Sequence, residues 1–267
     1  MATIGLVAGS GKLPAIFSDS ARQRGDKVIG IGLKGVTPPE IENHVDKFIW
    51  FELAALQKMI FAAVSNRITK IVLLGKLRKD IFFKNTEGFD EDTRKILGKL
   101  TDKKDYSMLN KVSETLSKFG MEVLDPTPYL KDYMPSKGVL TRRHPSEDEA
   151  KDLEYARKIA LENAGRDIGQ AVAVKNRTVI AIEAVEGTDE MIARAGSLSG
   201  RGFVVAKVAR PEQDMRFDVP LVGLETVEAL VKAGATALSI EAGRTFLIDR
   251  EEIIKLADEK SLSIVIV

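Results

Sequence analysis

IGLVAGSGKLP, residues 4–14, is the stretch that decides the fold of the first half of the chain. An apolar strand leads into the glycine loop Gly9, Ser10 and Gly11, and Pro14 then stands where a helix begins. This layout directs backbone N–H groups and a helix N-terminus at one point, as in α/β proteins that bind phosphate. Pro14 replaces the third glycine of the dinucleotide fingerprint, and Leu13 replaces the Ser or Thr of a Walker loop. The loop therefore predicts either a phosphorylated ligand without a familiar nucleotide motif or only a tight strand–helix turn.

The composition is that of a folded protein with balanced charge. The chain has 267 residues, 44% of them apolar, which suffices for one large domain or two ordinary ones. Its 40 basic and 39 acidic residues give a net charge of +1, whereas nucleic-acid-binding proteins usually carry a basic surplus. The absence of cysteine excludes disulfides and thiolate chemistry. No stretch reaches the roughly 18 apolar residues of a membrane-spanning helix. We expect a soluble, cytoplasmic protein that binds no nucleic acid.

Short apolar strands alternate with helical patterns in the first half of the sequence. The candidate strands are residues 2–8, 27–33, 47–51, 69–74 and 121–124, and helical spacing marks residues 14–24 and 52–65. This alternation predicts an α/β fold with a Rossmann-like parallel sheet covered on both faces. Ligands of such sheets bind at the carboxyl ends of strands. We therefore expect the glycine loop and the residues that follow the fourth strand, Leu74, Gly75 and Lys76, to face one site.

A proline-rich stretch separates the two halves. Four of the nine prolines fall within residues 125–148, which favours an extended connector. We place a Rossmann-like domain at residues 1–128, a linker at 129–146 and a second α/β domain at 147–267, with a cleft between the domains. In the second domain we predict helices at 147–164, 188–195, 224–233 and 250–260, and strands at 170–175, 178–184, 202–209, 236–241, 244–249 and 263–267.

The second half places acidic residues inside apolar segments, at Glu183, Asp218 and Glu241. Unpaired buried carboxylates are costly, so such groups are usually paired, bound to a metal or exposed in a cleft. Thr188 and Asp189 follow a glycine turn and add another acid. Oxygen ligands in a chain with only two histidines suit Mg²⁺ or Mn²⁺. Structural roles are equally compatible: Glu183 and Glu241 as buried ion pairs with Arg177, Lys207 or Arg244, Thr188 as a helix cap, and Asp218 as a turn residue.

Seven segments carry a resemblance to a known family. They are IGLVAGSGKLP (4–14), LLGKL (73–77), KKDYSMLNKV (103–112), DIGQAVAV (167–174), AIEAVEGTDEMIAR (181–194), AKVARPEQDMRFDVPLVGLETVEAL (206–230) and IEAGRTFLIDREEII (240–254). In this order they resemble the magnesium-dependent UDP-2,3-diacylglucosamine pyrophosphatases of lipid A biosynthesis, in the two-domain form unrelated to calcineurin-like phosphoesterases. The resemblance covers nearly the whole chain, and its second-half motifs are specific to this family.

The resemblance implies an activity and a set of site residues. The family splits the pyrophosphate of UDP-2,3-diacylglucosamine into UMP and 2,3-diacylglucosamine 1-phosphate (lipid X), with the UDP part on the N-terminal domain and the acylated sugar on the C-terminal domain. The family's Arg-x-Asp-x-Pro segment matches residues 216–220, so Asp218 is the expected catalytic acid, holding Mg²⁺ or positioning water. The implied substrate-binding residues are Gly9, Ser10, Gly11, Leu74, Gly75, Lys76, Asp105, Tyr106, Asp167, Gln170, Thr188 and Arg216. The implied metal ligands are Asp218, Asp189 and Glu183.

The resemblance also implies partners, and two alternatives stay open. It implies Mg²⁺ as the cofactor, with Mn²⁺ as a substitute, a reversible peripheral contact with the inner-membrane surface, and a homodimer. One alternative is an NADP-dependent oxidoreductase, in which Lys34 after the second strand accepts the 2′-phosphate. The other is a non-catalytic protein that binds a nucleotide sugar or a lipid. Mg²⁺-dependent release of UMP distinguishes the pyrophosphatase from this binding protein.

Overall fold

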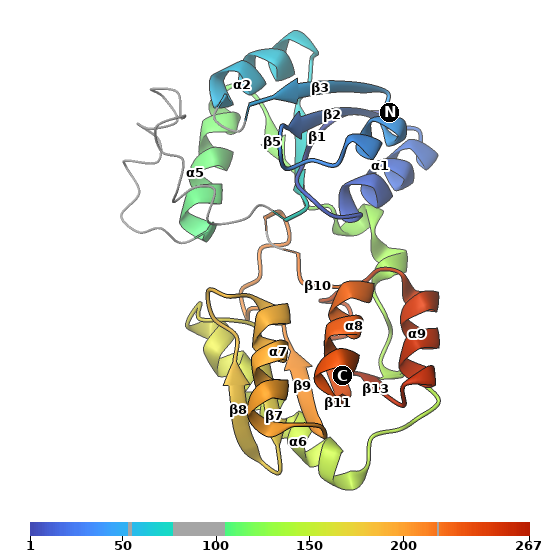
Figure 1. The fold of residues 1–267 in the computed structure, drawn as a ribbon. Coiled ribbons are helices and arrows are strands. Elements are labelled where there is room, and N and C mark those ends of the chain that lie inside the picture. Colours follow the sequence, from blue (N-terminus) through green and yellow to red (C-terminus); the bar gives the residue numbers. More distant parts are fainter. Residues whose placement is uncertain (53–54, 77–104, 218) are drawn as a thin grey trace. The chain divides into compact units, whose positions relative to one another are not determined.

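The chain folds into two units, each built around one large β-sheet (Figure 1). The computed structural model describes residues 1–52, 55–76, 105–217 and 219–267. The first unit consists of Met1–Lys131 and Asp214–Asp218, and the second consists of Asp132–Gln213 and Val219–Val267. A short segment late in the sequence therefore belongs with the N-terminal unit.

The first unit contains a five-stranded parallel sheet with the order β3-β2-β1-β4-β5. Its strands are β1 (Thr3–Ala8), β2 (Lys27–Leu33), β3 (Lys47–Phe51), β4 (Lys70–Leu74) and β5 (Glu122–Val123). The predicted parallel sheet is confirmed, because short apolar runs separated by helical segments leave few other ways to bury both faces.

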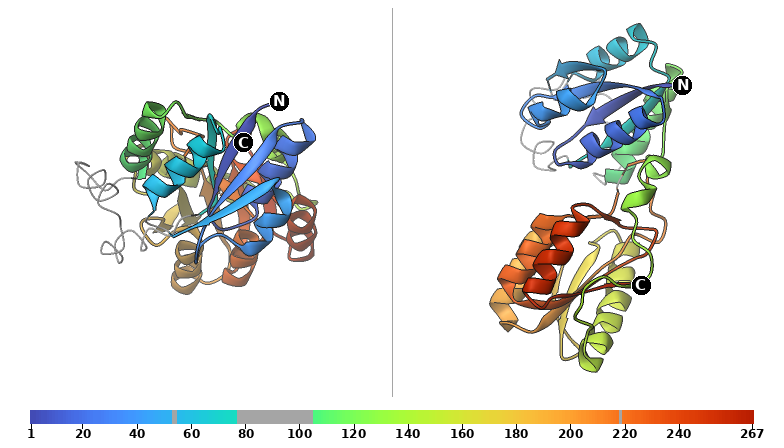
Figure 2. Two further views of the ribbon diagram at one scale, coloured as in Figure 1. Left: turned by 90° about the horizontal axis from the view of Figure 1, so that it is seen from above. Right: turned by 90° about the vertical axis from the view of Figure 1, so that its right-hand side faces the viewer.

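Helices cover both faces of this sheet (Figures 1 and 2). They are α1 (Leu13–Gln23), α2 (Leu56–Ser65) and α5 (Asp105–Lys118), with short 3₁₀ helices η1 (Pro39–His44) and η3 (Thr127–Tyr129) beside α1. One core, hereafter the α2–α5 core, joins Ile60 of α2 and Leu116 of α5 to Ile71 of β4 and Val123 of β5. The sequence analysis did not predict α5, although Val112 and Leu116 stand one helical turn apart.

Two loops cross at the carboxyl ends of β1 and β4. The N–H of Gly9 donates to the carbonyl of Leu74 at 2.7 Å, and Ser10 and Lys76 exchange two backbone hydrogen bonds of 3.0 and 2.9 Å. A Cβ on Gly9 would lie 2.7 Å from the carbonyl carbon of Gly75, and a Cβ on Gly75 would lie 2.7 Å from that of Gly9. Only glycine permits two backbones to approach this closely.

The second unit contains a mixed six-stranded sheet with the order β6-β13-β11-β9-β7-β8. Its strands are β6 (Gly138–Val139), β7 (Ala171–Lys175), β8 (Thr178–Ile182), β9 (Phe203–Lys207), β11 (Ala235–Ile240) and β13 (Ser263–Ile266). Strands β9, β11 and β13 are parallel, whereas β6, β7 and β8 run antiparallel to their neighbours. The predicted second α/β domain is thus confirmed. Strands β10 (Leu221–Val222) and β12 (Phe246–Leu247) form a separate parallel pair.

Four helices enclose the second sheet (Figure 2). They are α6 (Glu147–Gly165), α7 (Thr188–Ser199), α8 (Leu224–Ala233) and α9 (Arg250–Glu259). One core packs α6 against the sheet, and a separate core packs α7, α8 and α9 against it. The start of α6 is fixed by a capping box, in which Ser146 and Glu149 each accept a hydrogen bond from the other's backbone N–H.

Part of the stretch predicted as a linker belongs to the second unit. Strand β6 lies within residues 129–146 and pairs with β13, and η4 (Lys131–Tyr133) precedes it. The basic side chains of this stretch also have partners there. Arg142 pairs with Asp258 at 2.9 Å, and Arg143 pairs with Glu149 at 2.6 Å. These arginines attach the connector to the second unit.

A buried carboxylate holds the hairpin turn between β7 and β8. Asn176 and Arg177 have φ values of 51° and 57°, the left-handed pair typical of a type I′ turn. Asp152 of α6 is 7% exposed and accepts the N–H groups of both residues at 2.7 Å. The helix and the hairpin are thereby tied together through one side chain.

We predict that Gly9→Ala lowers the free energy of unfolding of the first unit by about 1–3 kcal/mol, because the new methyl group overpacks the loop crossing. Trp50 is the single tryptophan and lies on β3, so its fluorescence during urea unfolding reports on this unit. The neighbouring Ser10→Ala is the matched control, since it adds no atom and removes one exposed hydrogen bond to Lys76. Equal midpoints for Gly9→Ala and the wild type would contradict the close approach.

We predict that Asp152→Ala destabilises the second unit by about 2–3 kcal/mol, because it removes two hydrogen bonds to a buried, charged acceptor. Hydrogen exchange of residues 171–182, followed by mass spectrometry, should accelerate. Glu154→Ala on the same helix is the control, since Glu154 is exposed. Unchanged exchange in Asp152→Ala would show that the hairpin turn is stable without its carboxylate.

Candidate functional site

The glycine loop and the loop after β4 lie together, as the sequence predicts. The crossing engages the N–H groups of Gly9 and Ser10 with carbonyls of Leu74 and Lys76. Within the described part of the chain, nothing accepts a hydrogen bond from the N–H groups of Gly11 and Leu13, which precede and begin α1. Gly11 is exposed with φ +93°, and a Cβ there would meet nothing within 4 Å. The open part of the loop therefore begins at Gly11.

Two further residues expected on the nucleotide side begin α5. Asp105 and Tyr106 are its first residues, and their side chains lie outside the described part of the structure. Lys34, which the oxidoreductase alternative assigns to a 2′-phosphate, pairs with Glu52 at 2.7 Å, with both side chains more than half exposed. Such a pair is weak and does not favour a phosphate site.

In the second unit, the hydroxyl of Thr188 connects an acid and a base. It donates to Glu183 Oε1 at 2.8 Å and accepts from Lys207 Nζ at 3.0 Å. The other oxygen of Glu183 accepts the N–H of Gln170 at 3.0 Å. Gln170 precedes β7, Glu183 follows β8, Lys207 ends β9 and Thr188 begins α7, so four elements meet at one edge of the sheet. Three predicted site residues, Gln170, Glu183 and Thr188, are thereby brought together.

The same hydrogen-bond network extends to Asp167. Its carboxylate pairs with Arg210 Nε at 2.9 Å. Gln213 Oε1 accepts from the Arg210 N–H at 3.0 Å and from Gln170 Nε2 at 3.2 Å. The sequence analysis did not assign Lys207, Arg210 or Gln213 to the site. Their signal in the sequence is their place directly after the apolar run of β9.

Asp189 and Glu241 lie apart from this network in their direct contacts. Asp189 accepts a hydrogen bond from the hydroxyl of Thr226 at 3.3 Å. Glu241 is 5% exposed, pairs with Arg157 at 3.3 Å and accepts the N–H of Ala209 at 2.7 Å. Glu241 thus forms a buried ion pair, as one interpretation predicted, but its partner is Arg157 and not one of the predicted partners Arg177, Lys207 and Arg244.

Arg216 is held by its own chain neighbours. Its Nε lies 2.9 Å from Asp214 Oδ1 and its Nη2 lies 2.6 Å from Asp214 Oδ2. The guanidinium lies 4.7 Å from the centre of the Phe217 ring. Hydrogen bonding to Arg216 lowers the pKa of Asp214, so the acid is charged at neutral pH. Asp218, the expected catalytic acid, lies outside the described residues.

The donors at this edge of the second sheet suit a hard cation. Carboxylate oxygens are the ligands that Mg²⁺ prefers, and Glu183 and Asp189 supply them. Each Glu183 oxygen accepts one hydrogen bond and keeps a second lone pair. Among the described residues, no group of three or more His, Asp or Glu side chains could hold a metal ion. A complete ligand set therefore requires a further donor, for which Asp218 and the oxygens of a substrate are candidates.

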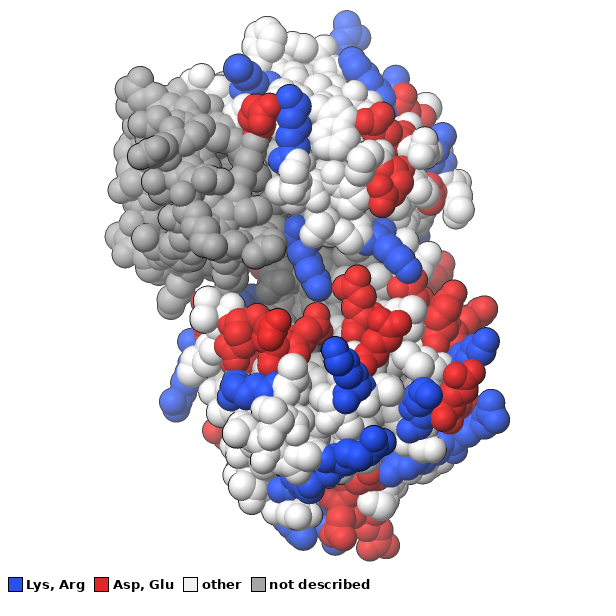
Figure 3. Space-filling view, viewed as in Figure 1, with Lys and Arg blue, Asp and Glu red and all other residues white. Residues whose placement is uncertain are grey.

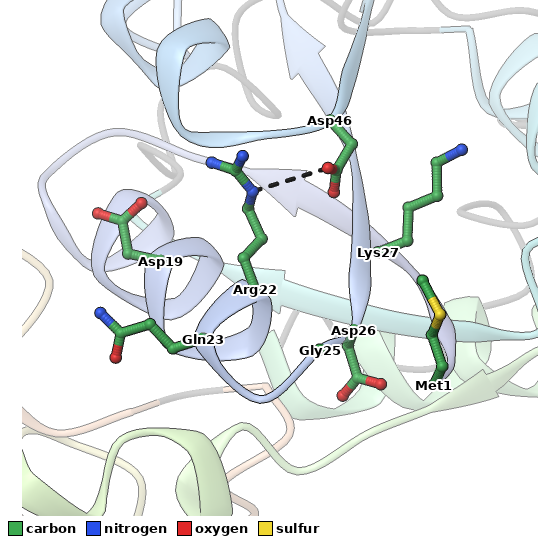
Figure 4. A pocket seen from close by; sticks show the side chains of 8 residues that line it. All are labelled: Met1, Asp19, Arg22, Gln23, Gly25, Asp26, Lys27 and Asp46. Atoms are coloured by element: carbon green, nitrogen blue, oxygen red, sulfur yellow. Dashed lines mark ion pairs between the residues drawn. The ribbon is translucent and has the colours of Figure 1, made fainter.

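An open hollow of about 790 Å³ lies at the amino ends of the strands of the first sheet (Figure 4). Its charged lining groups are engaged in local contacts. Asp46 pairs with Arg22 at 3.7 Å and accepts the N–H of Val28 at 2.8 Å. Asp26 accepts the N–H of Ala2, which lowers the pKa of its carboxyl. Because parallel sheets bind ligands at the carboxyl ends of their strands, this hollow is not the candidate site.

Three further observations concern the described residues. Acidic and basic side chains are interspersed on the faces of both units that Figure 3 shows. None of the described helices is long and apolar enough to cross a membrane. Two apolar side chains flank the Gln170–Glu183 contact: Val185 is 83% exposed and Ile168 is 45% exposed.

Solved structures show only a weak likeness to this chain. A UDP-glucose 4-epimerase from Bifidobacterium longum, in complex with NAD⁺ and UDP, has a TM-score of 0.28 and 17% identity over 43% of this chain and 34% of its own. An N5-carboxyaminoimidazole synthetase from Staphylococcus aureus, complexed with ADP, has a TM-score of 0.29 and 15% identity over 75% of this chain and 36% of its own. TM-scores this low give no information about the ligand of this chain.

Sequence relatives are more informative. The UDP-2,3-diacylglucosamine pyrophosphatase LpxI of Caulobacter vibrioides is 27% identical over 275 aligned positions, which cover 98% of this chain and 96% of the relative. The profile of the LpxI N-terminal domain matches residues 3–133, and that of the LpxI C-terminal domain matches residues 136–265. Because the two domain profiles follow one another along nearly the whole sequence, the chain belongs to the LpxI family.

Proposed function

We propose that this chain hydrolyses the pyrophosphate of UDP-2,3-diacylglucosamine to UMP and 2,3-diacylglucosamine 1-phosphate. The observation that carries the proposal is the match to both LpxI domains in their order, together with the full-length similarity to a relative that bears this activity in its name. The oxidoreductase alternative loses support, because the chain belongs to the LpxI family and the dinucleotide fingerprint is broken at Pro14.

In this proposal the first unit binds the uridine half of the substrate. The N–H groups at Gly11 and Leu13 suit a phosphate oxygen, because they begin a helix. The crossing with Leu74, Gly75 and Lys76 would hold the loop in the conformation that presents them. Pre-organised donors of this kind lose little entropy when the ligand binds. Asp105 and Tyr106, at the start of α5, would complete the nucleotide side.

The second unit would bind the acylated sugar. Gln170, Thr188 and Asp167 offer amide, hydroxyl and carboxylate groups at one edge of the sheet, which suits the polar atoms of a sugar. Val185 and Ile168 are exposed and lie two residues from Glu183 and Gln170 in the sequence, and they would contact the acyl chains. Because the substrate is a lipid, we extend the proposal to a reversible contact with the membrane surface. From the family resemblance we also propose a homodimer.

Catalysis would rest on charge neutralisation and on the position of a water molecule. The negative oxygens of a pyrophosphate repel a nucleophile, so cleavage needs positive charge and alignment more than covalent help. Mg²⁺ held by Asp218, Asp189 and Glu183 would supply positive charge and activate water. Lys207 Nζ, which donates to the Thr188 hydroxyl that in turn contacts Glu183, would add further positive charge. Asp218 would hold the cation or orient the attacking water.

We predict that the purified protein releases UMP from UDP-2,3-diacylglucosamine only with Mg²⁺ present, and that EDTA stops the release. Asp218→Asn should lower kcat roughly a thousandfold without changing the unfolding midpoint, because the carboxylate acts in the reaction. Asp148→Asn is the control, since its side chain is an exposed acid. Turnover is measured by chromatography of UMP. Binding of the substrate without UMP release by the wild type would favour the non-catalytic alternative.

We predict that Glu183→Gln raises the Mg²⁺ concentration for half-maximal activity by about tenfold, because a neutral amide is a poorer ligand. The amide can still accept the Gln170 N–H, which limits structural damage. Glu186→Gln is the control from the same turn, since Glu186 pairs with Arg194 and is not a proposed ligand. An unchanged Mg²⁺ requirement in Glu183→Gln would remove Glu183 from the ligand set.

A further inference from the structure

A short segment of the second half of the sequence is built into the first unit. Asp214–Asp218 groups with the first unit, whereas Gln213 before it and Val219 after it group with the second. The chain therefore passes from the second unit to the first and back within a few residues. Such a brief excursion needs specific contacts to hold it.

Within the segment, neighbouring side chains hold one another. The N–H of Phe217 donates to the carbonyl of Asp214 at 3.1 Å, which closes a turn. Arg216 contacts both carboxylate oxygens of Asp214 in a bidentate pair and lies over the Phe217 ring at 4.7 Å. A bidentate pair fixes the plane of the guanidinium, so the ring beneath it is fixed as well.

Phe217 joins this turn to the first unit. Its half-buried side chain packs against the α2–α5 core, as do Val7 of β1 and Leu73 of β4. Those two strands lead into the crossed loops at Gly9 and Gly75. A large aromatic ring in such a core resists displacement, because it brings more contact area than any other side chain of the segment.

We propose that Phe217 is a positioning residue for the reaction: its ring anchors the turn Asp214–Phe217 in the core of the first unit, and this turn directly precedes the expected catalytic acid in the sequence. This inference rests on the proposed role of Asp218. Arg216 then acts through Phe217 and Asp214.

The test compares kcat and KM of Phe217→Ala, Phe217→Leu and Leu116→Ala in UMP release. Leu116 is a buried residue of the same core on α5 and is the control for loss of packing. We expect Phe217→Ala to lower kcat by about ten- to a hundredfold, as misplaced catalytic groups do, with KM nearly unchanged. Phe217→Leu should retain most of the wild-type kcat. Leu116→Ala should have the wild-type kcat, measured at a temperature at which Trp50 fluorescence shows that the first unit is folded.

A second measurement is independent of activity. Hydrogen exchange of residues 212–219 should be faster in Phe217→Ala than in the wild type and in Leu116→Ala, because docking protects the Phe217 N–H. An unchanged exchange rate of residues 212–219 in Phe217→Ala would show that the Phe217 ring does not anchor this segment. Wild-type kcat in Phe217→Ala, or equal loss in Leu116→Ala, would overturn the positioning role. If the wild type released no UMP, the proposed function would fail, and the exchange result would still decide whether Phe217 anchors the segment.

Discussion

The first unit depends on two backbones that cross in van der Waals contact at Gly9 and Gly75. The crossing joins the carboxyl ends of the neighbouring strands β1 and β4 through hydrogen bonds between main-chain groups. Because main-chain groups make these hydrogen bonds, they depend on the close approach of the two glycines and not on particular side chains. The N–H groups of Gly9 and Ser10 are engaged in the crossing, whereas those of Gly11 and Leu13 donate to no acceptor among the described residues.

In the second unit, carboxylates lie at the edge of an apolar sheet and need hydrogen-bond partners there. Glu183 is satisfied by one N–H and one hydroxyl, and Thr188 passes the interaction on to Lys207. Glu241 is satisfied by a guanidinium and an N–H. Buried polar groups require such partners. The two acids nevertheless differ: Arg157 pairs directly with Glu241, whereas Glu183 accepts its two hydrogen bonds from neutral groups, an N–H and a hydroxyl.

The sequence predicted the elements well because their signals are local. Apolar runs of β1, β2 and β3 and the helical spacing of α8 needed no knowledge of tertiary contacts. Through the family resemblance it predicted Gln170, Glu183 and Thr188 as site residues, and the structure joins these three residues by hydrogen bonds. It missed Arg210 and Gln213, because their roles arise from contacts with residues more than 40 positions away, as in the pairs Arg210–Asp167 and Gln213–Gln170. It placed Glu241 among several open interpretations, since burial and the Arg157 partner are visible only in the fold.

The assignment of Asp214–Asp218 to the first unit could not be predicted from the sequence, because it depends on contacts between residues far apart in the chain. It changes which unit each part of the sequence contributes to. A domain boundary drawn along the sequence assigns Phe217 to the second half, where it would be one more apolar residue before Val219. Its packing against the core of the first unit means that the two halves of the sequence are not two independent functional parts. If the proposed role of Asp218 holds, nucleotide recognition and the catalytic acid depend on the same core, because the strands that bear the crossed loops and the ring that precedes Asp218 pack into it. Loss of the Phe217 ring would then affect catalysis, whereas a substitution elsewhere in that core, such as Leu116→Ala, would affect stability alone.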